Sequence, residues 1–222
     1  MSEVDLEFLR EKHSQFQESI DVAVRNLDGY HKIVGELLNE AERREIEELK
    51  EHAAELPESR RGAFWQMNYP VHWNEVFIYH FRLSFAILAM AVVEHHLSLV
   101  YKDAEVVTRL PLGRKDRRES TFEQAERFLV KCVGFNAPDE KLWESMQKAY
   151  RIRNAVAHNG GYVFDRKKAN QLKPCLRHFP GIKLVHGALE VEDEFCQAIR
   201  DLVRKFLSYL SREQGVLLTR YS

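Results

Sequence analysis

Residues 75–101, the most apolar stretch of this 222-residue chain, constrain the fold most strongly. Large apolar residues recur there at the three- and four-residue spacing of one helical face. They are Phe77, Phe81, Phe85, Leu88, Val92 and Leu99. Apolar residues also cover much of the opposite side, so the helix needs neighbours all around it. The sequence therefore predicts a central, buried helix wrapped by other elements.

Two amphipathic segments precede this helix. Residues 3–28 and 31–56 each have helical spacing, and Asp28-Gly29 between them predicts a stop. We expect them to form a helical hairpin, with the second helix largely exposed. Residues 62–74 contain four aromatic rings and Pro70, which disturbs a helix. We interpret them as a loop that packs its rings onto the core, in preference to a base-stacking platform.

Further helices are predicted after the apolar segment. They cover residues 121–133, 139–158 and 193–212. Two β-prone runs within 182–191 flank His186-Gly187 and predict a small hairpin. The expected fold is all-α: a four-helix bundle with a small β-hairpin excursion, preceded by the N-terminal helical hairpin.

The charges are unevenly distributed along the chain. Residues 1–58 hold 7 Lys and Arg against 16 Asp and Glu, whereas the remainder has a net positive charge, giving −1 in total. The first part would repel a polyanion and the second would attract one. We predict two domains, an acidic helical hairpin over 1–60 and a helical bundle over 61–215.

Several classes of protein and site are disfavoured by composition. The most apolar run, 83–93, is shorter than the roughly 18 residues of a membrane span, and the acidic start has no apolar signal region. The histidines show no zinc-site spacing and no Gly-rich phosphate loop appears, so neither metal nor cofactor is expected. The cysteines form no CxxC pair, so we expect free thiols in a reducing cytoplasm. These cysteines are Cys132, Cys175 and Cys196. Because no run is long enough to span a membrane, we expect no membrane association.

The helix predicted at 139–158 carries Arg153, Asn154 and His158 within six residues. Arginine can grip a phosphate with two parallel hydrogen bonds, and histidine transfers protons near neutral pH. On a helical wheel, Arg153 falls inside the apolar stripe, where its charge must be met. Either Glu94 of the apolar helix pairs with it, or Arg153 lines a cleft that binds an anion.

His158 falls on nearly the opposite side of the same helix. Asn154 and Arg151 share the face of His158, and Asn154 could orient its imidazole. One regular helix therefore keeps Arg153 and His158 apart. Either the helix frays at residues 159–161, or two copies of the chain meet. Metal-free RNA cleavage needs both a base and an acid, and a symmetric dimer would supply two histidines.

A basic loop follows the apolar helix, and one of its two interpretations is a contact with RNA. Its functional interpretation is a phosphate-contacting lip beside the cleft, and its alternative is a solvated loop. The residues are Arg109, Arg114, Lys115, Arg117 and Arg118. The run 166–168, Arg-Lys-Lys, allows the same two interpretations.

Arg153-Asn154-x3-His158 resembles the Arg-x4–6-His signature of the HEPN superfamily, in the "IRN…HN-G" form of uncharacterised bacterial members. The resemblance covers roughly residues 74–212. It implies a dimeric helical bundle that cleaves RNA without a metal and leaves a 2′,3′-cyclic phosphate. Arg153 would stabilise the scissile phosphate, His158 would be the acid and base, and Asn154 would orient it.

Such proteins often act in toxin–antitoxin, abortive-infection and other antiviral systems, which suggests an antitoxin or regulatory protein as a partner besides RNA. The family also contains inactive members that bind a protein, RNA or a nucleotide. A third interpretation is a structural bundle in which Arg153 anchors a buried ion pair. All three interpretations remain open from the sequence.

Overall fold

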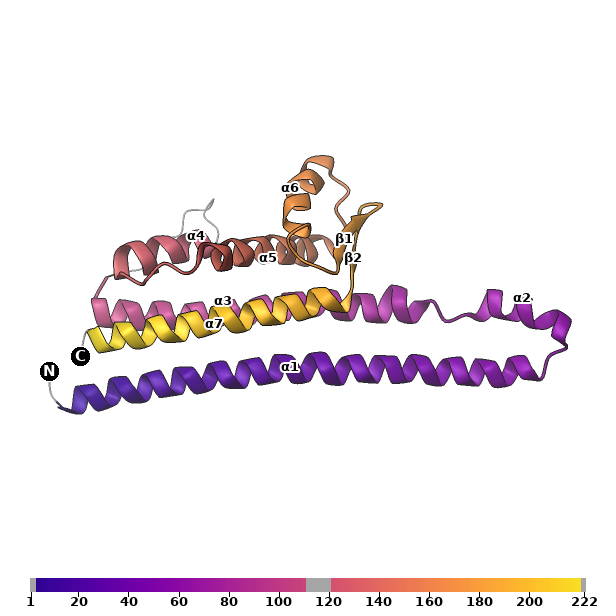
Figure 1. Cartoon of the computed structure of the whole chain (residues 1–222), viewed down its shortest axis with the longest axis horizontal. Coiled ribbons are helices and arrows are strands. Elements are labelled where there is room, and N and C mark those ends of the chain that lie inside the picture. The colour runs from indigo at the N-terminus through magenta and orange to yellow at the C-terminus, as the bar shows by residue number, and fades with distance from the viewer. Residues whose placement is uncertain (1–2, 111–120, 221–222) are drawn as a thin grey trace.

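The computed structural model describes residues 3–110 and 121–220, and it is a long, mainly helical molecule (Figure 1). The α-helices are α1 (Glu3–Ala54), α2 (Glu58–Asn68), α3 (Tyr79–Thr108), α4 (Thr121–Ala125), α5 (Glu140–Asn159), α6 (Arg166–Leu176) and α7 (Asp193–Arg220). Two wider π-type helices, η1 (Trp73–Ile78) and η2 (Glu126–Val133), continue into α3 and follow α4. Strands β1 (Ile182–Val185) and β2 (Ala188–Val191) complete the fold. The prediction of a helical protein with a small antiparallel hairpin is confirmed.

Helix α3 is the centre of the bundle, as its all-round apolar sequence predicted. It contacts α1, α5 and α7, and Phe85, Ala89 and Val93 are completely buried. By length and composition alone, the run Glu58–Thr108 could cross a membrane. A buried core helix has the same composition, so this run is weak evidence for a membrane span.

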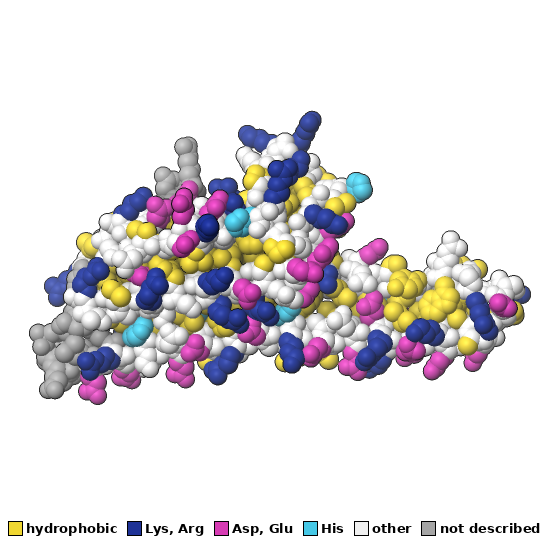
Figure 2. Space-filling view, in the orientation of Figure 1, with side chains coloured by type: hydrophobic (Ala, Val, Ile, Leu, Met, Phe, Trp, Pro, Cys, Tyr) yellow, Lys and Arg dark blue, Asp and Glu magenta, His cyan; other side chains and the backbone are white. Residues whose placement is uncertain are grey.

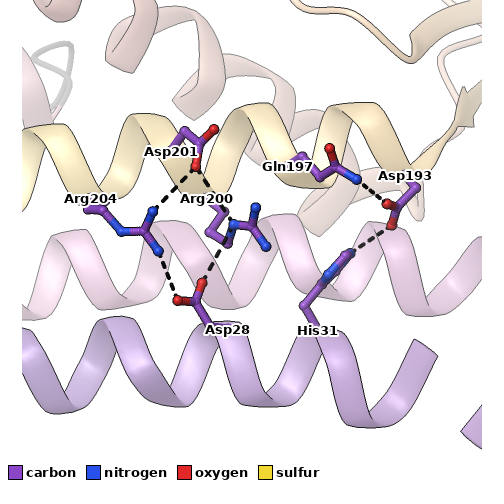
Figure 3. Close-up of polar contacts among 7 residues, drawn as sticks. All are labelled: Asp28, His31, Asp193, Gln197, Arg200, Asp201 and Arg204. Carbon is purple, nitrogen blue, oxygen red and sulfur yellow. Dashed lines mark hydrogen bonds and ion pairs between the residues drawn. The ribbon is translucent and has the colours of Figure 1, made fainter. Parts of the chain in front are cut away.

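Helix α1 corrects one prediction, because residues 3–54 form a single helix without a stop at Asp28-Gly29. A glycine inside a helix costs only about 1 kcal/mol. The carboxylate of Asp28 lies 2.8 Å from Arg204 Nη2 and 3.5 Å from Arg200 Nε, both on α7. Figure 3 shows Asp28 facing these two arginines. Packing against α7 therefore outweighs the local turn signal, and the predicted helical hairpin is wrong.

Further polar contacts join α1 to the start of α7. His31 Nε2 lies 2.9 Å from Asp193 Oδ1, and Gln197 Nε2 donates to Asp193 Oδ2 at 2.6 Å (Figure 3). Towards the other end, His13 Nδ1 and Gln214 Oε1 are 2.9 Å apart. The intervening apolar residues of α1, among them Phe16, Ile20 and Leu27, belong to the same core as α3 and α7.

The second half of α1 projects beyond α7 and is paired there with α2 and η1 (Figure 1). The predicted loop over 62–74 is wrong, because these residues are helical on both sides of a break at Pro70. Helix α2 has no buried residue, so its rings do not pack onto the core. Trp73 Nε1 instead donates to Glu45 Oε2 of α1 at 2.6 Å. The aromatic segment thus pairs with α1 outside the bundle.

The predicted hairpin is present as β1–β2, with the His-Gly turn at its tip. Ile182 pairs with Val191 and Val185 with Ala188, leaving His186 and Gly187 as the turn. Both turn residues have positive φ angles, 48° and 84°, as a tight two-residue turn requires. Helix α6 precedes this hairpin, packs on α5 and was not predicted.

Candidate functional site

Helix α5 is regular along its whole length, so the side of the helix on which His158 lies is fixed. Asp139 caps its start by accepting hydrogen bonds from the backbone NH groups of Lys141 and Leu142. Gly160 ends it with a left-handed φ of 60°, and its NH bonds to the carbonyl of Val156. The helix continues through Asn159, so the first of the two alternatives, fraying that would swing His158 towards Arg153, is not observed.

Arg153 faces α3, where the expected pair with Glu94 is present. Arg153 Nη2 donates to Glu94 Oε2 at 2.5 Å, and the two side chains are 19% and 27% exposed. Arg153 Nη1 donates to Asn154 Oδ1 at 2.9 Å. The guanidinium carbon also lies 5.1 Å from the ring centroid of Tyr150. The charge of Arg153 is therefore met within the chain.

A groove of about 670 Å³ runs between α5 and α6 on another side of α5. Its polar side chains come from both helices. They are Arg151, Asn154, His158 and Asn159 of α5, and Lys168 and Gln171 of α6. Ala155, Val163 and Leu172 supply the apolar part. Figure 2 shows Lys and Arg side chains gathered over α6. We call this feature the α5–α6 groove.

The groove brings together some of the predicted residues and separates others. Arg151, Asn154 and His158 share it, as the helical wheel indicated, whereas Arg153 does not line it. Within residues 3–110 and 121–220, no ion pair or side-chain hydrogen bond is present for Arg151 or for the ammonium of Lys168. Both cations are exposed, so they are available to an anion from solution.

The residues of α6 were the ones that the sequence predicted least well. Lys168 appeared there only within the run 166–168, and Gln171 was not singled out. One local signal was present: Asp165 caps α6, and its Oδ1 accepts a hydrogen bond from the NH of Lys168 at 2.7 Å. An aspartate directly before a helical segment is a helix-start signal.

Most of the predicted basic loop lies outside the described residues. Arg109 is exposed and ends α3 with a left-handed φ of 56°. Arg114, Lys115, Arg117 and Arg118 lie outside the described residues. Their proposed contact with RNA therefore remains a prediction.

The cysteines and histidines outside the groove bear on two other kinds of site, a metal site and a thiol nucleophile. In the described part of the chain, no three His, Cys, Asp or Glu side chains are placed to hold a metal ion. Cys132 is an exposed free thiol, whereas Cys175 and Cys196 are buried. Burial raises the pKa of Cys196 to about 12, with a smaller contribution from Asp193. A thiol with so high a pKa is a poor nucleophile near neutral pH.

Comparisons of the chain with protein-family models, curated proteins and solved structures found no match. The functional assignment therefore depends on the α5–α6 groove and on the short motif within α5.

Proposed function

We propose that the protein is a HEPN-type, metal-independent endoribonuclease that acts as a homodimer in the cytoplasm, in a toxin or antiviral defence setting. The observation that supports this proposal is the α5–α6 groove. It holds an exposed histidine, His158, beside the amide of Asn154 and the cations of Arg151 and Lys168, which have no carboxylate partner among the described residues. Cleavage of a phosphodiester needs these groups, because cations stabilise the charge on the phosphate and an imidazole transfers protons.

The proposed reaction begins when one His158 takes the proton of a ribose 2′-OH. The 2′-oxygen then forms a bond to the adjacent phosphorus, and the bond from phosphorus to the 5′-oxygen breaks. A protonated His158 of a second copy gives its proton to the departing 5′-oxygen. The products are a 2′,3′-cyclic phosphate and a 5′-hydroxyl. A single α5–α6 groove contains one histidine, so two copies supply the base and the acid together.

One observation favours a second candidate function, an RNA-binding module without catalysis. The family resemblance gives Arg153 the role of holding the scissile phosphate, yet Arg153 is engaged by Glu94 and does not line the groove. A groove that keeps Arg151 and Lys168 without that arginine can still bind a polyanion.

Cleavage of single-stranded RNA in EDTA tests the nuclease proposal. We expect the wild type to cut, and His158→Ala to lose roughly 10²–10⁴-fold in rate, which is the usual contribution of general acid–base catalysis. His52→Ala is the matched control, because His52 is an exposed histidine at the far end of α1. Equal cutting by wild type and His158→Ala would refute the proposed chemistry.

The dimer requirement has a separate test. The rate per protomer should fall on dilution in step with the dimer fraction measured by sedimentation. A diluted, fully monomeric sample that still cuts at the undiminished rate would exclude a cleft shared by two copies.

A further inference from the structure

We propose that the α5–α6 groove binds a backbone phosphate of single-stranded RNA through Arg151 and Lys168, and that Arg153 is a positioning residue acting through Asn154. This inference rests on the proposed function for the choice of RNA as the polyanion. It changes which arginine of the motif contacts that RNA.

Arg151 and Lys168 are suited to this contact because they lie on different helices and face the same groove. A phosphate between them would meet a guanidinium from α5 and an ammonium from α6. Several other surface cations already have carboxylate partners, such as Lys148 with Glu144 and Lys183 with Glu190. Neither Arg151 nor the Lys168 ammonium has such a partner among the described residues. Binding an anion therefore breaks no ion pair seen in this part of the chain.

Arg153 is poorly suited to the same contact. Its Nη2 is bonded to Glu94, its Nη1 is bonded to Asn154, and its plane lies near the ring of Tyr150. Turning this side chain into the groove would leave the partly buried carboxylate of Glu94 without its cation. Loss of one partner from a partly buried pair is unfavourable.

The bond between Arg153 and Asn154 gives Arg153 an indirect role. An asparagine side chain has one carbonyl oxygen, which accepts, and one NH2 group, which donates. Because Arg153 Nη1 occupies Asn154 Oδ1, the NH2 group remains for the groove that Asn154 lines. Glu94, Arg153 and Asn154 thus form a chain of contacts from α3 to the groove. It fixes a neutral donor on the face of α5 that carries His158.

Binding of a 2′-O-methyl RNA oligonucleotide, followed by fluorescence anisotropy from low to high salt, tests the two phosphate contacts. This RNA has no 2′-OH to attack, so its binding is independent of cleavage. Arg151→Gln and Lys168→Gln should each weaken binding and lower the slope of log affinity against log salt by about 0.7. Lys205→Gln is the matched control, since Lys205 is exposed on α7 and does not line the groove. It should leave the slope unchanged.

Two variants of Arg153 test the positioning role. Arg153→Gln, checked for folding by circular dichroism, should keep the wild-type salt slope. Arg153→Lys keeps a cation for Glu94 but loses the forked donor to Asn154. We expect it to melt near the wild type and to bind the 2′-O-methyl RNA about five-fold more weakly, the value of one hydrogen bond.

Three results would overturn the inference. They are absence of 2′-O-methyl RNA binding by the wild type, a slope for Arg153→Gln reduced as much as for Arg151→Gln, and wild-type affinity in a stable Arg153→Lys. If binding follows the expected pattern but natural RNA is never cut, the nuclease proposal fails and this inference stands.

Discussion

The ion pair between Arg153 and Glu94 gives a quantitative prediction for stability. Fully exposed pairs contribute about 0.2–1 kcal/mol, whereas breaking a fully buried pair costs about 3–5 kcal/mol. The two side chains are 19% and 27% exposed and bonded at 2.5 Å, so they lie between these limits. We expect Glu94→Gln, which leaves the Arg153 charge unpaired, to lower the free energy of unfolding by roughly 2 kcal/mol.

A double-mutant cycle separates the pair from its surroundings. Glu94→Gln, Arg153→Gln and the double variant are compared by urea unfolding, and the coupling energy should be about 1–2 kcal/mol. The single change should also lower the melting temperature by about 4–8 °C for a domain of this size. Glu190→Gln in the exposed pair with Lys183 is the control and should show no measurable change. A coupling energy near zero would refute the view that α5 is anchored to α3 by charge.

Two further predictions concern glycine and cysteine. Gly161→Ala should destabilise by about 1–3 kcal/mol, because φ is +86° and the new Cβ would lie 2.8 Å from Tyr79 Oη. Gly62→Ala, in the middle of α2 with nothing within 4 Å, should instead stabilise by about 0.5–1 kcal/mol, and equal shifts in urea unfolding would contradict this contrast. Iodoacetamide at pH 8 should label Cys132 in the native protein and leave Cys196 unlabelled, because burial raises the pKa of Cys196 to about 12. Mass spectrometry showing equal labelling rates would contradict the buried placement.

The elements predicted correctly are those whose signal is local and repeated. The apolar pattern of α3 extends over many turns, and the hairpin β1–β2 contains a His-Gly turn between β-prone runs. The break predicted at Asp28-Gly29 failed because its outcome depends on Arg200 and Arg204. These arginines lie far along the chain, and no local pattern reports their position.

In the candidate site, too, the features with a local signal were predicted and those that depend on distant contacts were not. The helical wheel of α5 placed Arg153 and His158 on different sides, and the acid Glu94 was the correct partner for Arg153. The groove itself was not predicted, because it requires α6 to pack on α5. That helix is short and mainly polar, so its apolar periodicity was too weak to identify it.

The pairing of α1 with α7 has a consequence for the order of events during synthesis. Gln17 bonds to Ser211, and His13 bonds to Gln214 across 201 residues of chain. At about 5–20 residues per second, the ribosome needs about 10–40 s to make that interval. Throughout this time, the apolar face of α1 has no α7 to cover it. Chaperone binding to nascent chains should therefore begin at α1 and persist until α7 has left the exit tunnel.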